Sequence, residues 1–261
     1  MQDLIDLETY PLDRLDSAEG ANLIAHCRAR LEADGMVDLP GFLRAPALRR
    51  AVAEVAPVLE HRAFFHSRRH NIYFKPSVPG LAPDHPALAE AETAHRSICA
   101  DQIPGSVLVA VYELPEIAVF LAAAMGKPAL YPMADPLARV NAMRYGAGQA
   151  LGWHFDRSEF TTTLLLQKPQ AGGVFEYARD LRSAEDPNHQ GVARLLAGEI
   201  AAERSAPEAG TLTIFRGRNT AHRVTPVEGA VDRIIAVFSY FERPGVMFSA
   251  EERIGFYGRA G

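Results

Sequence analysis

Apolar residues in the first part of the chain recur at the spacing of an α-helix. Those between Ser17 and Gly35 fall on one helical face, and serine is a favoured residue at a helix start. The spacing therefore predicts a first helix over this range. Further helices are expected over 47–60, 84–100 and 115–125, with a short strand and turn over 36–43.

The pattern changes near Ala138, where short runs of β-branched and aromatic residues begin, separated by glycine, proline and asparagine. One polar segment with helical spacing, 181–205, interrupts these runs. A succession of short strands predicts an antiparallel barrel or jelly roll. The expected strands lie within 139–145, 160–167, 173–178, 210–215, 221–227 and 232–241.

The two patterns together predict an α+β fold in a single domain, 1–261. It would consist of a helical N-terminal part (about 1–137), a β core (about 138–241) and a C-terminal extension (242–261). A chain of 261 residues with 48% hydrophobic residues can bury one core of that size. Monomer and homodimer are both compatible with these features.

Charge and composition narrow the possible partners. The net charge of −5 provides no attraction toward nucleic acid or anionic lipid, so neither is expected. No run reaches the roughly 20 apolar residues that span a bilayer, and the acidic start does not resemble a secretion signal, so a cytoplasmic location is expected. Cys27 and Cys99 are too few for a disulfide framework and are expected to be reduced.

The sequence Trp-His-Phe-Asp at 153–156 is the first candidate for chemistry. Residues two apart in a strand point to the same side, so His154 and Asp156 could bind one metal ion together. Two histidines and one carboxylate suit Fe(II) and leave coordination positions free for a chelating co-substrate and O2. His222, at the start of a later strand, could supply the second imidazole. A hydrogen-bonded or exposed histidine is the alternative interpretation of His154 alone.

An arginine after His222 extends this candidate site. Arg233 begins the most apolar strand of the chain, and a buried guanidinium requires an anionic partner. The distal carboxylate of 2-oxoglutarate could pair with it through two hydrogen bonds. Strand alternation places Ile235, Val237 and Ser239 on the same side as Arg233, toward the cavity. A surface ion pair with Asp232 or Glu228 is the alternative.

These features resemble the 2-oxoglutarate- and iron(II)-dependent oxygenases with a double-stranded β-helix core, a jelly-roll or cupin-like fold. The resemblance rests on NAMRYGAG, WHFD, HRV and the following arginine, over about 138–241. The segments QALGWHFDRSEFTTTLLLQ, AGGVFEYARDLRS, FRGRNTAHRVTPVEG and SYFERPG are similar to the subgroup of amino-acid halogenases and their hydroxylase relatives. That similarity extends from HNIYF, near residue 70, to the C-terminus.

The resemblance implies the cofactors, the substrate class and the outcome. The protein would use Fe(II), 2-oxoglutarate and O2 to attack an unactivated C–H bond of a small polar, amine-bearing substrate, often a free amino acid. The halogenating members carry a small residue where Asp156 stands here, so hydroxylation is implied. Asn141 and Tyr145 are implied to help bind 2-oxoglutarate, although they could equally be barrel-lining residues. Trp153 could shape the pocket beside the metal or belong to the core.

Substrate contacts are expected mainly from HSRRHNIYFKP, a polar and aromatic segment suited to a loop over the metal. Arg157 and Ser239 are further substrate-side candidates. Two other interpretations of the segment are a solvated basic loop and a separate metal site at His66 and His70, if it were helical. The substrate candidates within the segment are Arg68, Arg69, His70, Asn71 and Tyr73.

Other function classes remain open at this stage. A non-oxidative cupin-type isomerase or hydrolase with Zn or Mn could use the same three ligands, but it would have no task for Arg233. A barrel that binds or senses without turnover is a further possibility. Among oxygenases, a peptide, a nucleotide or a carrier-tethered amino acid could replace the free amino acid as substrate. Dependence on 2-oxoglutarate and release of succinate distinguish these alternatives.

Overall fold

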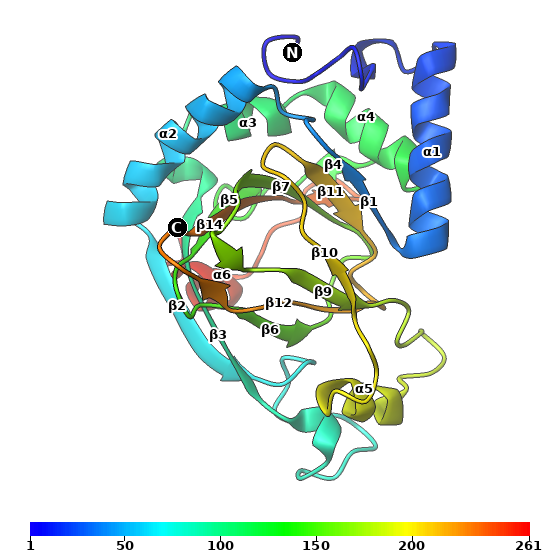
Figure 1. Cartoon of the computed structure of the whole chain (residues 1–261), viewed down its shortest axis with the longest axis vertical. Helices are drawn as coiled ribbons and strands as arrows, with labels where there is room; N and C mark the ends of the chain where they lie inside the picture. Colours follow the sequence, from blue (N-terminus) through cyan, green and yellow to red (C-terminus); the bar gives the residue numbers. More distant parts are fainter.

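The computed structural model describes all residues, 1–261, as a mixed α/β architecture (Figure 1). The first helix runs as expected from its capping residues: Ser17 accepts a hydrogen bond from the Gly20 amide, and Gly35 ends the helix with φ 72°. The α-helices are α1 Ala18–Asp34, α2 Ala45–His61, α3 Val107–Tyr112, α4 Pro115–Ala124, α5 His189–Leu196 and α6 Ala250–Tyr257. Short 3-10 helices are η1 Leu12–Arg14, η2 Pro86–Leu88 and η3 Ala100–Gln102.

Two antiparallel sheets carry most of the strands. The larger sheet has seven strands in the order β1-β11-β7-β14-β5-β3-β2, and the smaller has four in the order β10-β9-β12-β6. Two short pairs, β13-β8 and β15-β4, complete the β structure. The strands are β1 Met36–Leu39, β2 Phe64–His70, β3 Ala91–Cys99, β4 Tyr131–Pro132, β5 Val140–Tyr145, β6 Leu151–His154, β7 Thr161–Gln167, β8 Ala171–Gly172, β9 Phe175–Ala178, β10 Glu203–Ser205, β11 Leu212–Phe215, β12 Ala221–Val224, β13 Val227–Glu228, β14 Arg233–Phe238 and β15 Tyr240–Phe241.

The larger sheet is covered on its outer face by the N-terminal helices α1 to α4 (Figure 1). Residues of these helices and of the sheet form one core cluster of 34 buried side chains. Along β14, Ile234, Ala236 and Phe238 enter this core, whereas Ile235 belongs to a separate cluster with Tyr145 on the other face. The alternation predicted for this strand is therefore confirmed at these positions.

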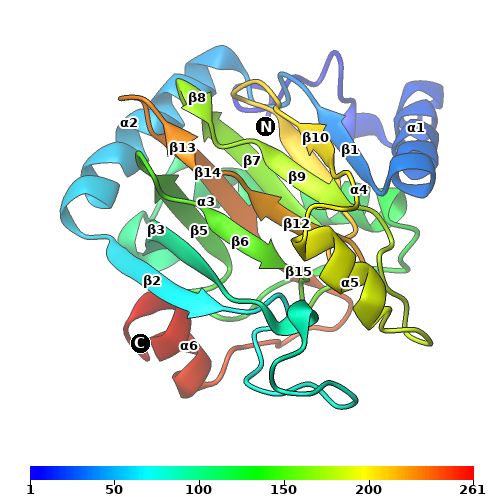
Figure 2. The same cartoon turned by 60° about the horizontal axis from the view of Figure 1, so that its bottom comes forward.

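The smaller sheet lies opposite the inner face of the larger one, with β6, β12 and β9 across from β5, β14 and β7 (Figure 1). Helix α5 lies beside the smaller sheet, and the C-terminal helix α6 lies near β2 and β3 (Figure 2). Residues that point inward from either sheet share the space between them, and the candidate site lies there.

One predicted helix is wrong: within 84–100 the chain forms η2 and then β3, the neighbour of a second strand, β2, that was also not expected. The N-terminal part thus contributes three strands, β1 to β3, to the larger sheet. The physical reason is visible in β3, where the buried positions include Thr93, His95 and Ser97. Polar residues on the buried face remove the apolar alternation by which a half-buried strand is recognised.

The helices of the structure do not include one with the length and apolar character needed to cross a membrane.

Candidate metal centre

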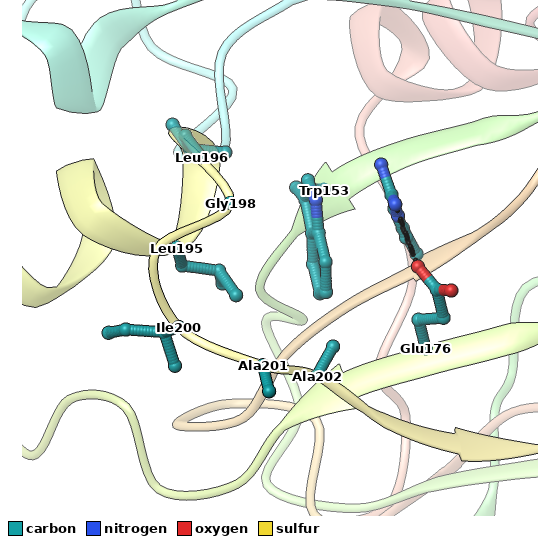
Figure 3. A pocket seen from close by; sticks show the side chains of 9 residues that line it. Trp153, Glu176, Leu195, Leu196, Gly198, Ile200, Ala201 and Ala202 are labelled. Atoms are coloured by element: carbon teal, nitrogen blue, oxygen red, sulfur yellow. Dashed lines mark hydrogen bonds and ion pairs between the residues drawn. The ribbon is translucent and has the colours of Figure 1, made fainter.

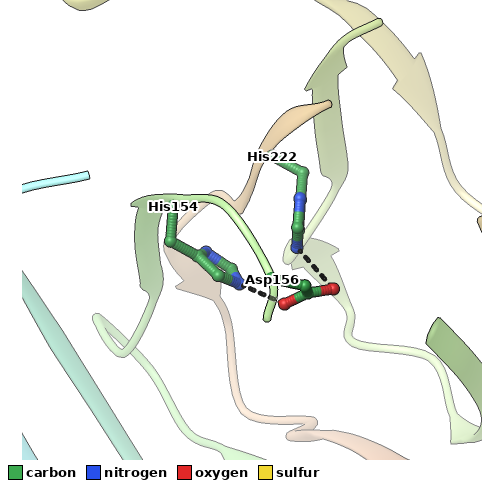
Figure 4. A group of neighbouring side chains, drawn as sticks. All are labelled: His154, Asp156 and His222. Atoms are coloured by element: carbon green, nitrogen blue, oxygen red, sulfur yellow. Dashed lines mark ion pairs between the residues drawn. The ribbon is translucent and has the colours of Figure 1, made fainter. Parts of the chain in front are cut away.

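Neighbouring strands of the smaller sheet bring the two predicted histidines together. His154 ends β6 and is paired in register with His222 of β12, and their ring centroids are 4.1 Å apart. Asp156 follows β6 and lies between them (Figure 4). Its two carboxylate oxygens are each 3.5 Å from one imidazole Nε2, and the three candidate ligand atoms lie within 4.8 Å of one another.

The backbone orients both imidazoles. Nδ1 of His154 is 2.9 Å from the Gly152 carbonyl oxygen, and Nδ1 of His222 is 2.9 Å from the Thr220 carbonyl oxygen. A carbonyl only accepts, so each Nδ1 donates its proton and each Nε2 keeps a free lone pair. These lone pairs belong to the atoms that face Asp156, as metal coordination requires.

The surroundings of Asp156 are built around its carboxylate. The Thr161 hydroxyl donates a hydrogen bond of 2.5 Å to Oδ2, and the Asp156 amide donates to the Gly217 carbonyl at 3.0 Å. A Cβ atom on Gly217 would lie only 2.1 Å from Oδ2. Glycine at 217 therefore makes room for this carboxylate.

The protonation states suit a metal. Burial alone would raise the pKa of Asp156, but the adjacent His222 and His154 hold it well below its ordinary value, so the carboxylate is ionised. Burial, together with His222, lowers the pKa of His154 and favours the neutral imidazole. Two imidazoles and one carboxylate form the donor set typical of non-haem Fe(II) sites, and these residues fit that ion.

Arg233 lies on the opposite sheet, at the start of β14, and its side chain is 5% exposed. No carboxylate lies within 4.0 Å of its guanidinium; the neighbouring Asp232 instead pairs with Arg144 at 3.5 Å. Burial lowers the pKa of Arg233, and Tyr145, whose ring centroid is 5.7 Å from the guanidinium carbon, opposes that shift. A buried cation without an anionic partner is costly, so this site suits an anionic ligand.

The two residues implied beside Arg233 differ in their surroundings. Tyr145 is paired in register with Arg233 and is 1% exposed, and the one hydrogen bond of its hydroxyl goes to the Met143 sulfur, at 3.7 Å. The Asn141 amide is occupied by protein contacts: it donates to the Leu137 carbonyl at 2.9 Å and accepts from the Tyr257 hydroxyl at 3.0 Å. Tyr145 therefore stands beside the candidate anion site, whereas Asn141 connects β5 to α6.

The segment expected to form a loop over the metal is strand β2 followed by a turn. Phe74, which was not among the predicted site residues, stacks on His70 at 4.2 Å and lies edge-on to His154 at 5.7 Å. The Arg68 guanidinium lies over the Phe74 ring at 4.7 Å, and its buried Nε has no hydrogen-bond partner. Arg68 is thus brought close to the metal centre.

The other candidates of this segment have contacts elsewhere. Arg69 is exposed and lies 3.7 Å from Glu90, so it does not join the site. The Asn71 side chain bonds the Lys75 carbonyl at 2.6 Å and the Tyr73 amide at 3.0 Å, which shapes the turn. The Tyr73 hydroxyl is 3.0 Å from Nδ1 of His189 in α5. Neither a solvated basic loop nor a helical metal site at His66 and His70 is observed.

Trp153 does not lie beside the metal. It alternates with His154 along β6 and lines a cavity of about 300 Å³ on the outer face of the smaller sheet, together with residues of and after α5 (Figure 3). Arg223 stacks over its ring at 4.9 Å. The expectation that Trp153 shapes the metal pocket is therefore wrong, because strand alternation directs neighbouring side chains to opposite faces.

Arg157 and Ser239 also have other neighbours than expected. Arg157 is largely exposed and forms an ion pair with Glu252 of α6. Ser239 follows the end of β14, and its backbone carbonyl accepts a hydrogen bond of 2.8 Å from the Tyr112 hydroxyl. Thr161 and Gly217, which support Asp156, were missed because no local pattern identifies a residue by its distance from a ligand.

Comparisons with known proteins agree with this geometry. The structure is similar to a 2OG-Fe(II) oxygenase family oxidoreductase from Burkholderia pseudomallei (17% identity, 85% and 92% of the two chains covered, TM-score 0.54). It is also similar to the epimerase SnoN in complex with Fe3+, α-ketoglutarate and nogalamycin RO (17%, 85% and 84%, 0.56). A third is a Pseudomonas putida prolyl-4-hydroxylase (18%, 85% and 100%, 0.52). At these identities the likeness shows a shared fold.

The sequence comparisons differ in their outcome. No curated protein matches the chain. The sequence model of the halogenase D family matches residues 19–248, which include all three candidate ligands and Arg233. The protein therefore belongs to the halogenase D family and has the fold of the 2-oxoglutarate- and iron(II)-dependent oxygenases.

Proposed function

We propose that this protein is a 2-oxoglutarate- and iron(II)-dependent dioxygenase that hydroxylates an unactivated C–H bond of a small polar substrate, a free amino acid or an amino-acid-like metabolite. His154, Asp156 and His222 would hold the iron, and Arg233 with Tyr145 would bind the distal carboxylate of 2-oxoglutarate. Residues 1–261 would form one oxygenase domain whose two facing sheets are a double-stranded β-helix.

The observation that carries the proposal is the carboxylate of Asp156 between the two imidazoles. The halogenating relatives have a small residue at this position, which leaves a coordination site for chloride. Here Thr161 donates to the carboxylate, and Gly217 has no side chain that could occupy its space. These supports favour a site that uses Asp156 as a ligand and therefore favour hydroxylation over halogenation.

Each part of the site has its own task in this proposal. Iron(II) and 2-oxoglutarate, when bound, supply the oxidising chemistry with O2. The protein orients the two Nε2 atoms through the Gly152 and Thr220 carbonyls, keeps Asp156 ionised, and provides a buried cation at Arg233. The requirement for a keto-diacid also gives Arg233 a role that a non-oxidative metalloenzyme would lack.

The substrate would bind on the side of Arg68 and Phe74. No carboxylate pairs with Arg68. Its guanidinium lies over the Phe74 ring, and the same ring lies edge-on to His154, a ligand in this proposal. A substrate carboxylate at Arg68 would place the rest of a small molecule close to the iron. Positioning of this kind is the main contribution that such a protein makes to rate.

The test is anaerobic reconstitution with Fe(II) and 2-oxoglutarate, followed by addition of O2 and single amino acids. We expect succinate release to depend on one class of substrate and the product to gain one oxygen atom. Chloride should not be incorporated. Product formation without 2-oxoglutarate would favour a non-oxidative enzyme, and a chlorinated product would contradict the role of Asp156.

A further inference from the structure

Strand β6, which ends at the candidate ligand His154, is an edge strand of the smaller sheet and pairs within that sheet only with β12. Its other side lies against β3 of the larger sheet, where the two sheets meet (Figure 2). Buried backbone amides that lack a strand partner require another acceptor. For the buried amide of Gly152 in β6 that acceptor is a side chain, the Thr93 hydroxyl of β3, at 2.9 Å.

The Thr93 hydroxyl is fixed from its other side by His70 of β2. Nδ1 of His70 lies 2.9 Å from the Asn71 carbonyl oxygen, which can only accept, so Nδ1 carries a ring proton. Burial lowers the pKa of His70 and favours the neutral ring, in which Nε2 has a free lone pair. Nε2 lies 2.6 Å from the Thr93 oxygen and therefore accepts the hydroxyl proton. The Thr93 oxygen in turn accepts the proton of the Gly152 amide.

Gly152 connects these two side chains to the candidate metal ligand. Its amide donates to Thr93, and its carbonyl accepts the Nδ1 proton of His154 at 2.9 Å. Glycine has no side chain that restricts its backbone, so the hydrogen bonds at its two polar groups define its conformation. A Cβ atom here would lie 3.3 Å from the Thr93 oxygen, which is a tight contact. His70, Thr93, Gly152 and His154 thus form one continuous hydrogen-bonded chain.

The other imidazole of the centre is held differently. His222 lies on β12, which pairs on one side with β6 and on the other with β9. The Thr220 carbonyl orients its ring, but the Thr220 hydroxyl accepts from the backbone amide of Asp180, an exposed residue, at 3.4 Å. Two neighbouring strands fix the backbone around His222. His154 belongs to an edge strand, where buried side chains of the larger sheet take the place of the missing neighbour.

We propose that Thr93 and His70 are positioning residues for His154, which hold its ring so that Nε2 points at the metal. The proposal rests on the function proposed above, in which His154 is an iron ligand. Groups that orient a histidine ligand typically contribute about tenfold to hundredfold to metal affinity. His70, expected among the substrate contacts, has both ring nitrogens bonded within the protein and is 6% exposed, so its role is exerted through Thr93.

The first experiment removes the Thr93 hydroxyl and measures the Kd for Fe(II) by anaerobic calorimetry on the full chain. Thr93→Val keeps the shape of the side chain but leaves the Gly152 amide and Nε2 of His70 without their partner. The Kd for Fe(II) should rise about tenfold, the lower end of the range for an outer partner, because Thr93 acts through the backbone. Thr93→Ser keeps the hydroxyl and should bind Fe(II) within about threefold of the wild-type protein.

The second experiment changes the other end of the chain and carries the test if Thr93→Val does not fold. His70→Leu removes the acceptor of the Thr93 proton but leaves the Gly152 amide bonded, so the Kd for Fe(II) should rise by only about threefold to fivefold. His70→Gln can place an amide oxygen near the position of Nε2 and should retain wild-type affinity. A larger loss of affinity in His70→Gln than in His70→Leu would overturn the proposed chain.

The matched control is Thr213→Val. Thr213 is also a buried strand threonine, but its hydroxyl donates to Asp38, away from the metal centre. The substitution should lower the Tm and leave the Kd for Fe(II) unchanged. If Thr93→Val and His70→Leu lower the Tm in the same way without a change in that Kd, both residues are structural and the inference fails. Wild-type protein that binds Fe(II) no more tightly than His154→Ala would instead overturn the proposed metal centre.

Discussion

The two sheets of this protein differ in what lies behind them. The larger sheet is covered by helices and contributes to a core of 34 buried residues, whereas the smaller sheet borders clusters of only seven and three buried residues. Yet the smaller sheet and the turn after it carry all three candidate metal ligands, and the larger carries Arg233, the candidate 2-oxoglutarate anchor. Apolar packing is therefore concentrated behind the larger sheet, whereas the candidate metal ligands belong to the smaller sheet and the turn after it.

The largest expected effect comes from the smaller sheet. Replacing His154, Asp156 or His222 by alanine should abolish succinate formation, because each removes one of only three protein ligands. Added Fe(II) should raise the Tm of the wild-type protein and not that of the variants, as measured by anaerobic thermal unfolding. His189→Ala, a histidine on α5 outside the triad, is the control. Full turnover in any ligand variant would remove that residue from the site.

The same substitution in the two regions should separate their contributions to stability. Leu164→Ala, at a fully buried position of the 34-residue core, should lower the free energy of unfolding by about 2–5 kcal/mol. Leu195→Ala, in the seven-residue cluster beside the smaller sheet, should cost less because that site can collapse more easily. Denaturant titration measures both. Equal losses of unfolding free energy in the two variants would show that packing behind the two sheets contributes equally to stability.

Arg233 tests whether the larger sheet also has a chemical role. Arg233→Gln should raise the Kd for 2-oxoglutarate by one to two orders of magnitude, corresponding to about 1.5–3 kcal/mol for hydrogen bonds to a charged group. Metal affinity and Tm should change little. Arg144→Gln, on the neighbouring strand β5 and paired with Glu60 and Asp232, is the matched control. An unchanged Kd for 2-oxoglutarate would assign its carboxylate to another group.

Acidification should weaken the larger sheet through His95. Its pKa is about 3 in the folded protein, below the ordinary value of 6.5, so the unfolded chain binds a proton that the folded chain does not. His95 therefore has no effect on the free energy of unfolding above pH 6.5. Below that pH the free energy of unfolding falls by up to about 1.4 kcal/mol per pH unit as the pH drops toward 3. Unfolding free energies between pH 7 and 5 should fall less in His95→Leu. Parallel curves would contradict this contribution.

The smallest effect is expected at the surface. Glu252→Gln removes the exposed ion pair between α6 and Arg157, the residue after the ligand Asp156. The free energy of unfolding should change by about 1 kcal/mol or less, since solvent screens such pairs. Glu199→Gln in the exposed pair of α5 should behave similarly. A much larger loss for Glu252 alone would show that α6 supports the metal centre.

Much of the candidate site could be predicted because its chemistry requires particular residue types. Only histidine and carboxylate side chains offer the needed ligand atoms, and the spacing of His154 and Asp156 places both within reach of one ion. The guanidinium of Arg233, at the start of a buried strand, likewise indicated an anionic ligand. The helix from Ser17 to Gly35 and the strands after Ala138 follow from local periodicity and capping.

Residue types and local spacing were enough to predict the candidate metal ligands, a buried arginine and the elements with regular apolar spacing. The three-dimensional structure was needed to show that β2 and β3 complete the larger sheet, that Trp153 faces away from the candidate metal centre, and that Thr161 and Gly217 support Asp156. The reason is that periodicity records which residues are buried, whereas polar residues on a cavity wall are buried without being apolar. Their neighbours are set by strand pairing between distant segments, and spacing along the chain does not contain that information.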